Sequence, residues 1–215
     1  MSIALSIGNN LTTGGVFTAS AVNNTSVTNV TDCASVPGGG VLKLLSTQTA
    51  SASASISFTS DIDSTYDSYI FKFINMHPAT DNVNFQVNFR DGGSLYDAVK
   101  TTSIFRTYHS EADIEAGLDL ESREDLAQST SSQVLGRNIG SDADQSTSGS
   151  LTLFNPSSTT YVKHFIANSD MSGYNDYQLI HYVAGYCNTT TAIDGVQFSM
   201  SSGNFDGIIK MYGVV

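Results

Sequence analysis

Residues 82–90, Asn-Val-Asn-Phe-Gln-Val-Asn-Phe-Arg, alternate strictly between polar and apolar side chains. Successive side chains of a β-strand point to opposite faces of a sheet, so this period of two places Val83, Phe85, Val87 and Phe89 on one face. The polar residues between them then face water. The segment is predicted to be a half-buried strand with a core-facing row of large apolar groups.

Similar patterns recur along the chain. Alternation of Ser with Ala, Ile and Phe predicts one strand over residues 51–59, and Tyr69, Phe71 and Phe73 share one face of the segment 66–75. Ile70 and Ile74 occupy the other face of that segment, which predicts a central strand buried on both sides. Further candidate strands cover residues 41–45, 103–109, 151–155, 161–167, 177–187, 192–200 and 207–213.

Turn residues separate these candidate strands, and no long helical period is present. About nine to eleven short strands without helices indicate an all-β domain. We expect an antiparallel β-sandwich, jelly-roll-like, formed by residues 41–215.

Residues 1–40 have a different composition. They are rich in Gly, Asn, Thr, Ser, Val and Ala and end in Pro37-Gly38-Gly39-Gly40. Such a segment buries little apolar surface, so any order depends on a neighbour. We predict an extended N-terminal arm or linker, and the sequence leaves both a flexible tail and an assembly arm open.

The charge balance excludes two partner classes. Nine Lys and Arg against twenty Asp and Glu give the chain of 215 residues a net charge of −11, and only 13% of residues are charged. We therefore expect no nucleic-acid binding and no attachment to anionic membranes, because both need clustered basic groups. No apolar run reaches the roughly 18 residues of a membrane helix, and no secretion signal is visible, so neither membrane insertion nor export is expected.

Acidic residues concentrate in the segment 110–125. Ile114, Ala116, Leu118 and Leu120 alternate there with polar residues, which predicts a strand with an acidic, solvated outer face rather than a helix. Whether the segment 111–125 binds a cation stays open, and Asp142 and Asp144 are a weaker calcium candidate. The segment contains Glu111, Asp113, Glu115, Asp119, Glu121, Glu124 and Asp125. Residues 122–148 are predicted to be a long polar loop with a short helical turn near residues 124–128.

The usual arrangements of catalytic residues are not visible in the sequence. The histidines do not pair at metal-ligand spacing, so structural or interface roles are favoured; they are His77, His109, His164 and His181. No serine-nucleophile elbow or phosphate-binding glycine loop occurs. We expect no catalytic residue, no cofactor and no metal site. Cys33 and Cys187 are far apart in sequence, and two unpaired thiols are favoured over a bridge, which spacing alone does not exclude.

Tyrosines gather in the last third of the chain. Exposed tyrosine rings can stack on sugars, but they are equally common in cores and subunit interfaces, which we favour. The residues are Tyr161, Tyr174, Tyr177, Tyr182 and Tyr186.

Several stretches resemble small virion structural proteins of tailed bacteriophages, especially those of marine bacteria. The similarity extends from Ser46 to Val215. It is carried by Ser46-Thr47-Gln48-Thr49-Ala50, Asp63-Ser64-Thr65-Tyr66 with Tyr69-Ile70-Phe71-Lys72-Phe73, Asn75-Met76-His77-Pro78-Ala79-Thr80, Leu153-Phe154-Asn155-Pro156-Ser157-Ser158-Thr159-Thr160 and Gly207-Ile208-Ile209-Lys210-Met211-Tyr212-Gly213. These motifs are structural rather than catalytic.

The resemblance implies a component of the phage particle, of the kind described as tail-fibre or minor structural proteins. We expect a non-enzymatic, surface-exposed module of the tail fibre or of the head exterior, made in the host cytoplasm. Residues 1–40 would anchor it to other virion proteins, and a homotrimer is our hypothesis for its assembly. The alternative is a protein that binds or depolymerises host surface glycans through the loop 122–148 or the C-terminal tyrosines.

Overall fold

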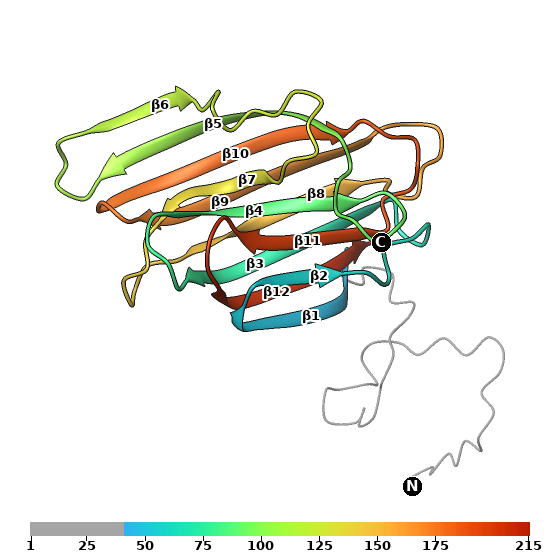
Figure 1. The fold of residues 1–215 in the computed structure, drawn as a ribbon, viewed down its shortest axis with the longest axis horizontal. Helices are drawn as coiled ribbons and strands as arrows, with labels where there is room; N and C mark the ends of the chain where they lie inside the picture. The colour runs from blue at the N-terminus through green and yellow to red at the C-terminus, as the bar shows by residue number, and fades with distance from the viewer. Residues whose placement is uncertain (1–40) are drawn as a thin grey trace, which may run out of the picture. The chain divides into compact units, whose positions relative to one another are not determined.

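The computed structural model describes residues 41–215, and every regular element in this range is a β-strand (Figure 1). The all-β prediction is confirmed. The strands are β1 Leu42–Ser53, β2 Ser55–Phe58, β3 Ser68–Pro78, β4 Val83–Arg90, β5 Lys100–Ser110, β6 Ala116–Leu120, β7 Gln133–Ile139, β8 Thr147–Phe154, β9 Lys163–Gly173, β10 Tyr177–Cys187, β11 Gly195–Met200 and β12 Phe205–Val214. No helix long and apolar enough to cross a membrane occurs among these residues.

All strand pairings are antiparallel and join into one sheet that nearly closes into a barrel. One run follows the order β1-β12-β3-β8-β9 and continues through β10 and β5 to the edge strand β6. The second run, β2-β11-β4-β7, meets β9 through the pairing of Ile139 with Gly173. At the opposite ends of the runs, Gln48 Nε2 on β1 donates a hydrogen bond to the Ser57 carbonyl on β2 over 2.7 Å.

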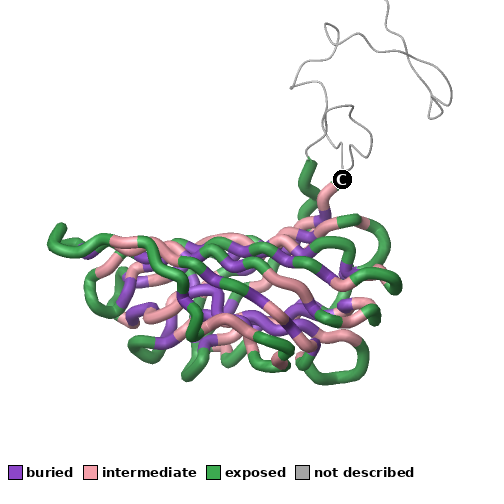
Figure 2. Tube along the Cα trace, turned by 90° about the horizontal axis from the view of Figure 1, so that it is seen from above, coloured by how far each residue is buried: buried purple, intermediate pink, exposed green. Residues whose placement is uncertain are grey.

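The alternating segment 82–90 forms β4 as predicted, but the expectation that all its polar residues face water was wrong for Asn88, which is 8% exposed and accepts a hydrogen bond from the buried Lys100. Val83 is 4% exposed, and Phe85, Val87 and Phe89 are fully buried. Phe85 stacks on Phe198 of β11 with ring centroids 5.8 Å apart. Because buried aromatic rings contribute large apolar areas, this row forms a large part of the core. Buried positions recur along the strands, and exposed residues gather at the turns (Figure 2).

β3 lies between β12 and β8, so its prediction as a central strand is confirmed. Tyr69, Phe71 and Phe73 are buried. The ring centroids of Phe73 and Phe85 lie 5.0 Å apart in the core. The prediction that the second face of this strand is also buried was wrong, because Ile74 is 38% exposed. That face of the sheet is open in the described chain.

The predicted single strand over residues 51–59 was wrong. The chain bends at Ala52, which has a φ of 47°, and its two parts pair with different strands, β1 with β12 and β2 with β11. The Ala52 amide donates to Asp206 Oδ1 over 2.7 Å, which holds the bend. Ser and Ala continue across it, so side-chain pattern alone did not mark the break.

The predicted long loop 122–148 and its helical turn were also wrong. β7 lies inside this segment, and β8 begins before it ends. Val134, Leu135 and Ile139 are buried in the core, and residues 124–128 contain no helix. With only seven residues and no regular alternation, β7 gave little signal.

The acidic segment contains a strand, β6, as predicted, but its two faces are reversed relative to the prediction. Leu118 and Leu120 are 67% and 71% exposed, whereas Glu121 is 6% exposed. Asp119 lies opposite Arg106 of β5. The acidic side is therefore the inner side, where it meets arginines, and the apolar side faces outward.

Candidate functional site

A cavity of about 520 Å³ lies against the inner side of β5, β6 and β10. Its other walls come from β7, the segment after β6 and the turn between β9 and β10. Three tyrosines (Tyr108, Tyr174 and Tyr177) and three arginines (Arg106, Arg123 and Arg137) line it, together with Glu115, Asp119, Asn138, Asn175 and Leu179. Three of the chain's nine Lys and Arg residues thus meet at one place.

Glu121 organises the arginines of this cavity. Its carboxylate accepts a hydrogen bond from Arg137 Nη1 of β7 over 2.9 Å and lies 3.1 Å from Arg106 Nε of β5. Asp119 and Glu124 add longer contacts of 3.5 Å to Arg106 and Arg137, respectively. The Glu121 side chain is only 7% exposed, so this shared carboxylate holds both guanidinium groups where they face the cavity.

His181 lies directly beneath this network. It pairs with Arg106 in the register of β10 and β5 and is fully buried. Burial, helped by the charges of Arg106 and Arg137, lowers the pKa of His181 to about 4. Neither ring nitrogen forms a well-directed hydrogen bond, although the nearby Leu135 carbonyl slightly favours the protonated form. The imidazole is therefore neutral at pH 7 and shielded from solvent.

Tyr108 lines the cavity, and its ring lies over Gly117 of β6, which has no side chain to block it. A Cβ at Gly117 would lie 2.6 Å from the Tyr108 hydroxyl oxygen. Arg106 stacks over the same ring at 5.3 Å from its centroid. The ring centroids of Tyr177 and Tyr108 lie 6.2 Å apart. The Tyr177 hydroxyl donates a hydrogen bond to Glu115 Oε2 over 2.6 Å, and this bond raises the pKa of Tyr177.

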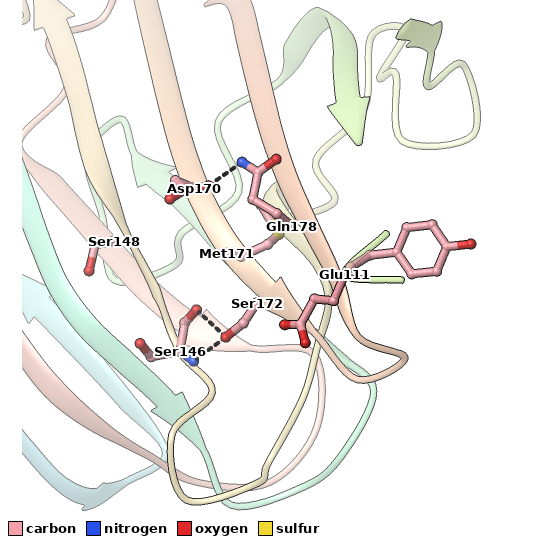
Figure 3. A pocket seen from close by; sticks show the side chains of 8 residues that line it. Glu111, Ser146, Ser148, Asp170, Met171, Ser172 and Gln178 are labelled. Carbon is pink, nitrogen blue, oxygen red and sulfur yellow. Dashed lines mark hydrogen bonds between the residues drawn. The ribbon is translucent and has the colours of Figure 1, made fainter. Parts of the chain in front are cut away.

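A second groove, of about 350 Å³, shares Tyr177 with the cavity (Figure 3). Hydroxyl, amide and carboxyl groups from β8, β9 and β10 line it, and Glu111 extends toward Ser172 (Figure 3). Gln178 Nε2 donates to Asp170 Oδ1 over 2.5 Å, and the Ser146 amide donates to Ser172 Oγ over 3.0 Å. Its polar groups largely satisfy one another.

Two buried lysines flank Cys187. Lys100 and Lys163 pair with Cys187 from the neighbouring strands β5 and β9. Lys100 Nζ donates to Asn88 Oδ1 over 2.5 Å and to the Ala98 carbonyl over 2.7 Å, and Lys163 Nζ donates to the Thr189 carbonyl over 3.0 Å. Burial lowers the pKa of Lys100 to about 8 and raises that of the Cys187 thiol to about 12.

This arrangement makes the Cys187 thiol a poor nucleophile. Cys33 lies outside the described residues, so the expectation of unpaired thiols stays a prediction. Sequence reasoning missed the lysine pair, because strand register rather than spacing brings the two together.

The four histidines lie apart from one another. His77 Nδ1 lies 2.7 Å from the Gln145 carbonyl, His109 Nε2 lies 3.0 Å from Asp113, and His164 packs against Tyr186. Within residues 41–215, no three metal-ligating side chains converge, including those of the acidic segment and the Asp142–Asp144 pair.

The acidic residues expected to be solvated are mostly engaged in contacts. Besides the arginine contacts of Asp119, Glu121 and Glu124, Asp125 Oδ1 accepts a hydrogen bond from the Ile104 amide over 2.7 Å. Glu115 accepts from Tyr177. The solvated interpretation was therefore wrong for Glu121, which is buried, and only partly right for the half-buried Glu124 and Asp125. Glu115 and Asp119 stay exposed, as expected.

The C-terminal tyrosines do not form one cluster. Tyr174 and Tyr177 reach the cavity, whereas Tyr182 stacks on Phe105 on the outer face, with ring centroids 4.9 Å apart. The cavity also contains Arg123, Arg137 and Asn138 from the segment 122–148. The structure thus brings together parts of the two segments considered for glycan binding.

No protein-family model, curated protein or solved structure matches this chain.

Proposed function

We propose that the chain is a non-enzymatic structural component of a tailed-bacteriophage virion, exposed on the tail fibre or on the head exterior. The sequence resemblance described above motivates this assignment. The low share of charged residues, 13%, suits a module that faces solvent without attracting nucleic acid.

The observation that carries the proposal is the state of the reactive groups. The Cys187 thiol is buried with a raised pKa, His181 is buried with a lowered one, and Lys100 is held by Asn88 and a main-chain carbonyl. Nucleophiles and general bases act when they are accessible and have a pKa near the working pH. These groups are placed as parts of the core, which favours a structural role.

We also propose that the sheet is folded into a jelly-roll-like sandwich, in which the run β2-β11-β4-β7 packs face to face on the longer run. Contacts between Phe85 and Phe73 and between Phe89 and Phe165 support this, because β4 pairs with neither β3 nor β9. A hydroxyl-rich sandwich is a common architecture for modules that dock on a larger particle.

Residues 1–40 are proposed to anchor the module to capsid or tail proteins, and three copies are proposed to assemble about a threefold axis. The test compares phage particles produced with the full chain and with a chain lacking residues 1–40. We expect the shortened protein to fold, as measured by circular dichroism, and to be absent from purified particles. Equal incorporation of both forms would contradict the anchoring role.

A further inference from the structure

We propose that the cavity bounded by β5, β6, β7 and the β9–β10 turn is a binding site for a saccharide unit that carries an acidic group. This site is independent of where the chain sits on a particle. Its volume of about 520 Å³ falls within the range of roughly 300–1,000 Å³ that is usual for small-ligand sites.

The aromatic part of the site is positioned before any ligand arrives. The Tyr174 amide donates to the Asn138 carbonyl of β7 over 3.0 Å, which ties the β9–β10 turn to the cavity wall. Tyr174 is 42% exposed, and Tyr177 is fixed by its hydrogen bond to Glu115. Sugar rings present C–H faces that stack on such rings, and a fixed platform reduces the entropy lost on binding.

The polar part offers both donors and acceptors. Arg106 and Arg137 are held by Glu121 and supply donors, and the exposed Asp119 supplies an acceptor. Sugar hydroxyls both donate and accept, so a mixed lining of this kind suits them. Arg106 Nε is buried and, within the described chain, has no hydrogen bond of good geometry despite its proximity to Glu121.

Arg123 explains the preference for an acidic group. No carboxylate of residues 41–215 lies within ion-pair distance of its guanidinium, whereas Arg106 and Arg137 are both neutralised. In a chain with a net charge of −11, an exposed guanidinium at a cavity rim is a local exception. A sugar carboxylate is the planar acceptor that a guanidinium binds best.

The carboxylates around the cavity favour binding over cleavage. Asp119 and Glu121 contact Arg106, and Glu115 accepts from Tyr177. Polysaccharide hydrolysis uses one carboxyl as an acid and another as a base or nucleophile. Glu121 lies between two arginines and Glu115 is held by Tyr177, which leaves Asp119 without a second free carboxyl.

The test is binding of the full chain to a printed array that holds galacturonate, glucuronate and mannuronate oligomers and their uncharged glucose, galactose and mannose counterparts. Retention on at least one uronate oligomer and weaker retention on its uncharged counterpart are expected. The Kd is then measured by calorimetry with the retained oligomer. No retention, or equal retention of the charged and uncharged forms, would overturn the proposal.

Variants locate the site. Tyr174→Ala and Arg123→Met are each expected to raise the Kd at least about tenfold, because the first removes the stacking ring and the second removes the cation that pairs with the sugar carboxylate. Tyr182→Ala is the matched control, because Tyr182 is 41% exposed, like Tyr174, but lies on the outer face. It is expected to change the Kd less than about twofold. All three side chains are exposed to solvent, so we expect the variants to fold. An unchanged Kd in both Tyr174→Ala and Arg123→Met would show that the cavity is not the binding site.

Discussion

Glu121 is the residue on which the arrangement of the cavity depends most. It is buried and bridges Arg106 and Arg137, so its removal leaves two largely buried guanidinium groups without their shared partner. We predict that Glu121→Ala lowers the free energy of unfolding by about 2–3 kcal/mol, the size expected for lost hydrogen bonds between charged groups that are partly exposed. Asp119→Ala is the control, because Asp119 is 48% exposed, and a loss below about 1 kcal/mol is expected. Urea denaturation distinguishes the two variants, and equal losses would show that the bridge is unimportant.

His181 makes stability depend on pH. Its pKa falls from 6.5 to about 4 on folding, so between these values the unfolded chain binds a proton that the folded chain does not. The contribution of this group is complete above pH 6.5 and declines by about 3 kcal/mol as the pH falls to 4. We predict that His181→Gln removes this part of the pH dependence. Urea denaturation at pH 7, 5.5 and 4 checks it, and identical pH profiles for both proteins would contradict the assignment.

The sequence predicted which apolar residues of β4 are buried, but neither the burial of Asn88 nor the partners of the charged residues. Phe85 and Phe89 follow from alternation alone. The burial of Lys100, Lys163 and Glu121 depends on register between strands distant in sequence. A pattern within one segment carries no information on that register.

At the scale of the strand, β6 shows where alternation is ambiguous. Alternation identified a strand but not which side faces the core. Alternation would normally place Leu118 and Leu120 on the core side of the sheet. They face outward, and Asp119 lies on the inner side, where it contacts Arg106 of β5. Strand existence was therefore predictable for β6, whereas its orientation was set by a neighbour that the sequence did not reveal. β7 was missed altogether, because it is short and irregular.

Strand alternation yields a prediction of its own. Phe85→Ala opens a cavity among Phe73, Phe198 and Phe205, and we expect a loss of about 3–5 kcal/mol in the free energy of unfolding. Phe105→Ala removes a ring that is 45% exposed and is expected to cost about 1 kcal/mol or less. Guanidinium denaturation of both variants is the measurement. Comparable losses would mean that the two faces of the sheet are not distinguished as described.

At the scale of the whole molecule, the proposed trimer predicts a mass three times the 22.8 kDa of the chain. Exposed apolar side chains on the outer face, among them Leu120, Phe105 and Ile166, are compatible with contacts between copies. Light scattering at several concentrations measures the mass directly. A strictly monomeric protein at high concentration would contradict the trimer.

The central claim is that the chain is a part of a phage particle. Quantitative mass spectrometry of gradient-purified phage particles, from a lysate in which the chain is produced, is the decisive measurement. If the proposal is correct, peptides of this chain occur in the particle fraction at a constant ratio to the major capsid protein, in a copy number divisible by three. Peptides confined to the soluble fraction of the lysate would contradict it.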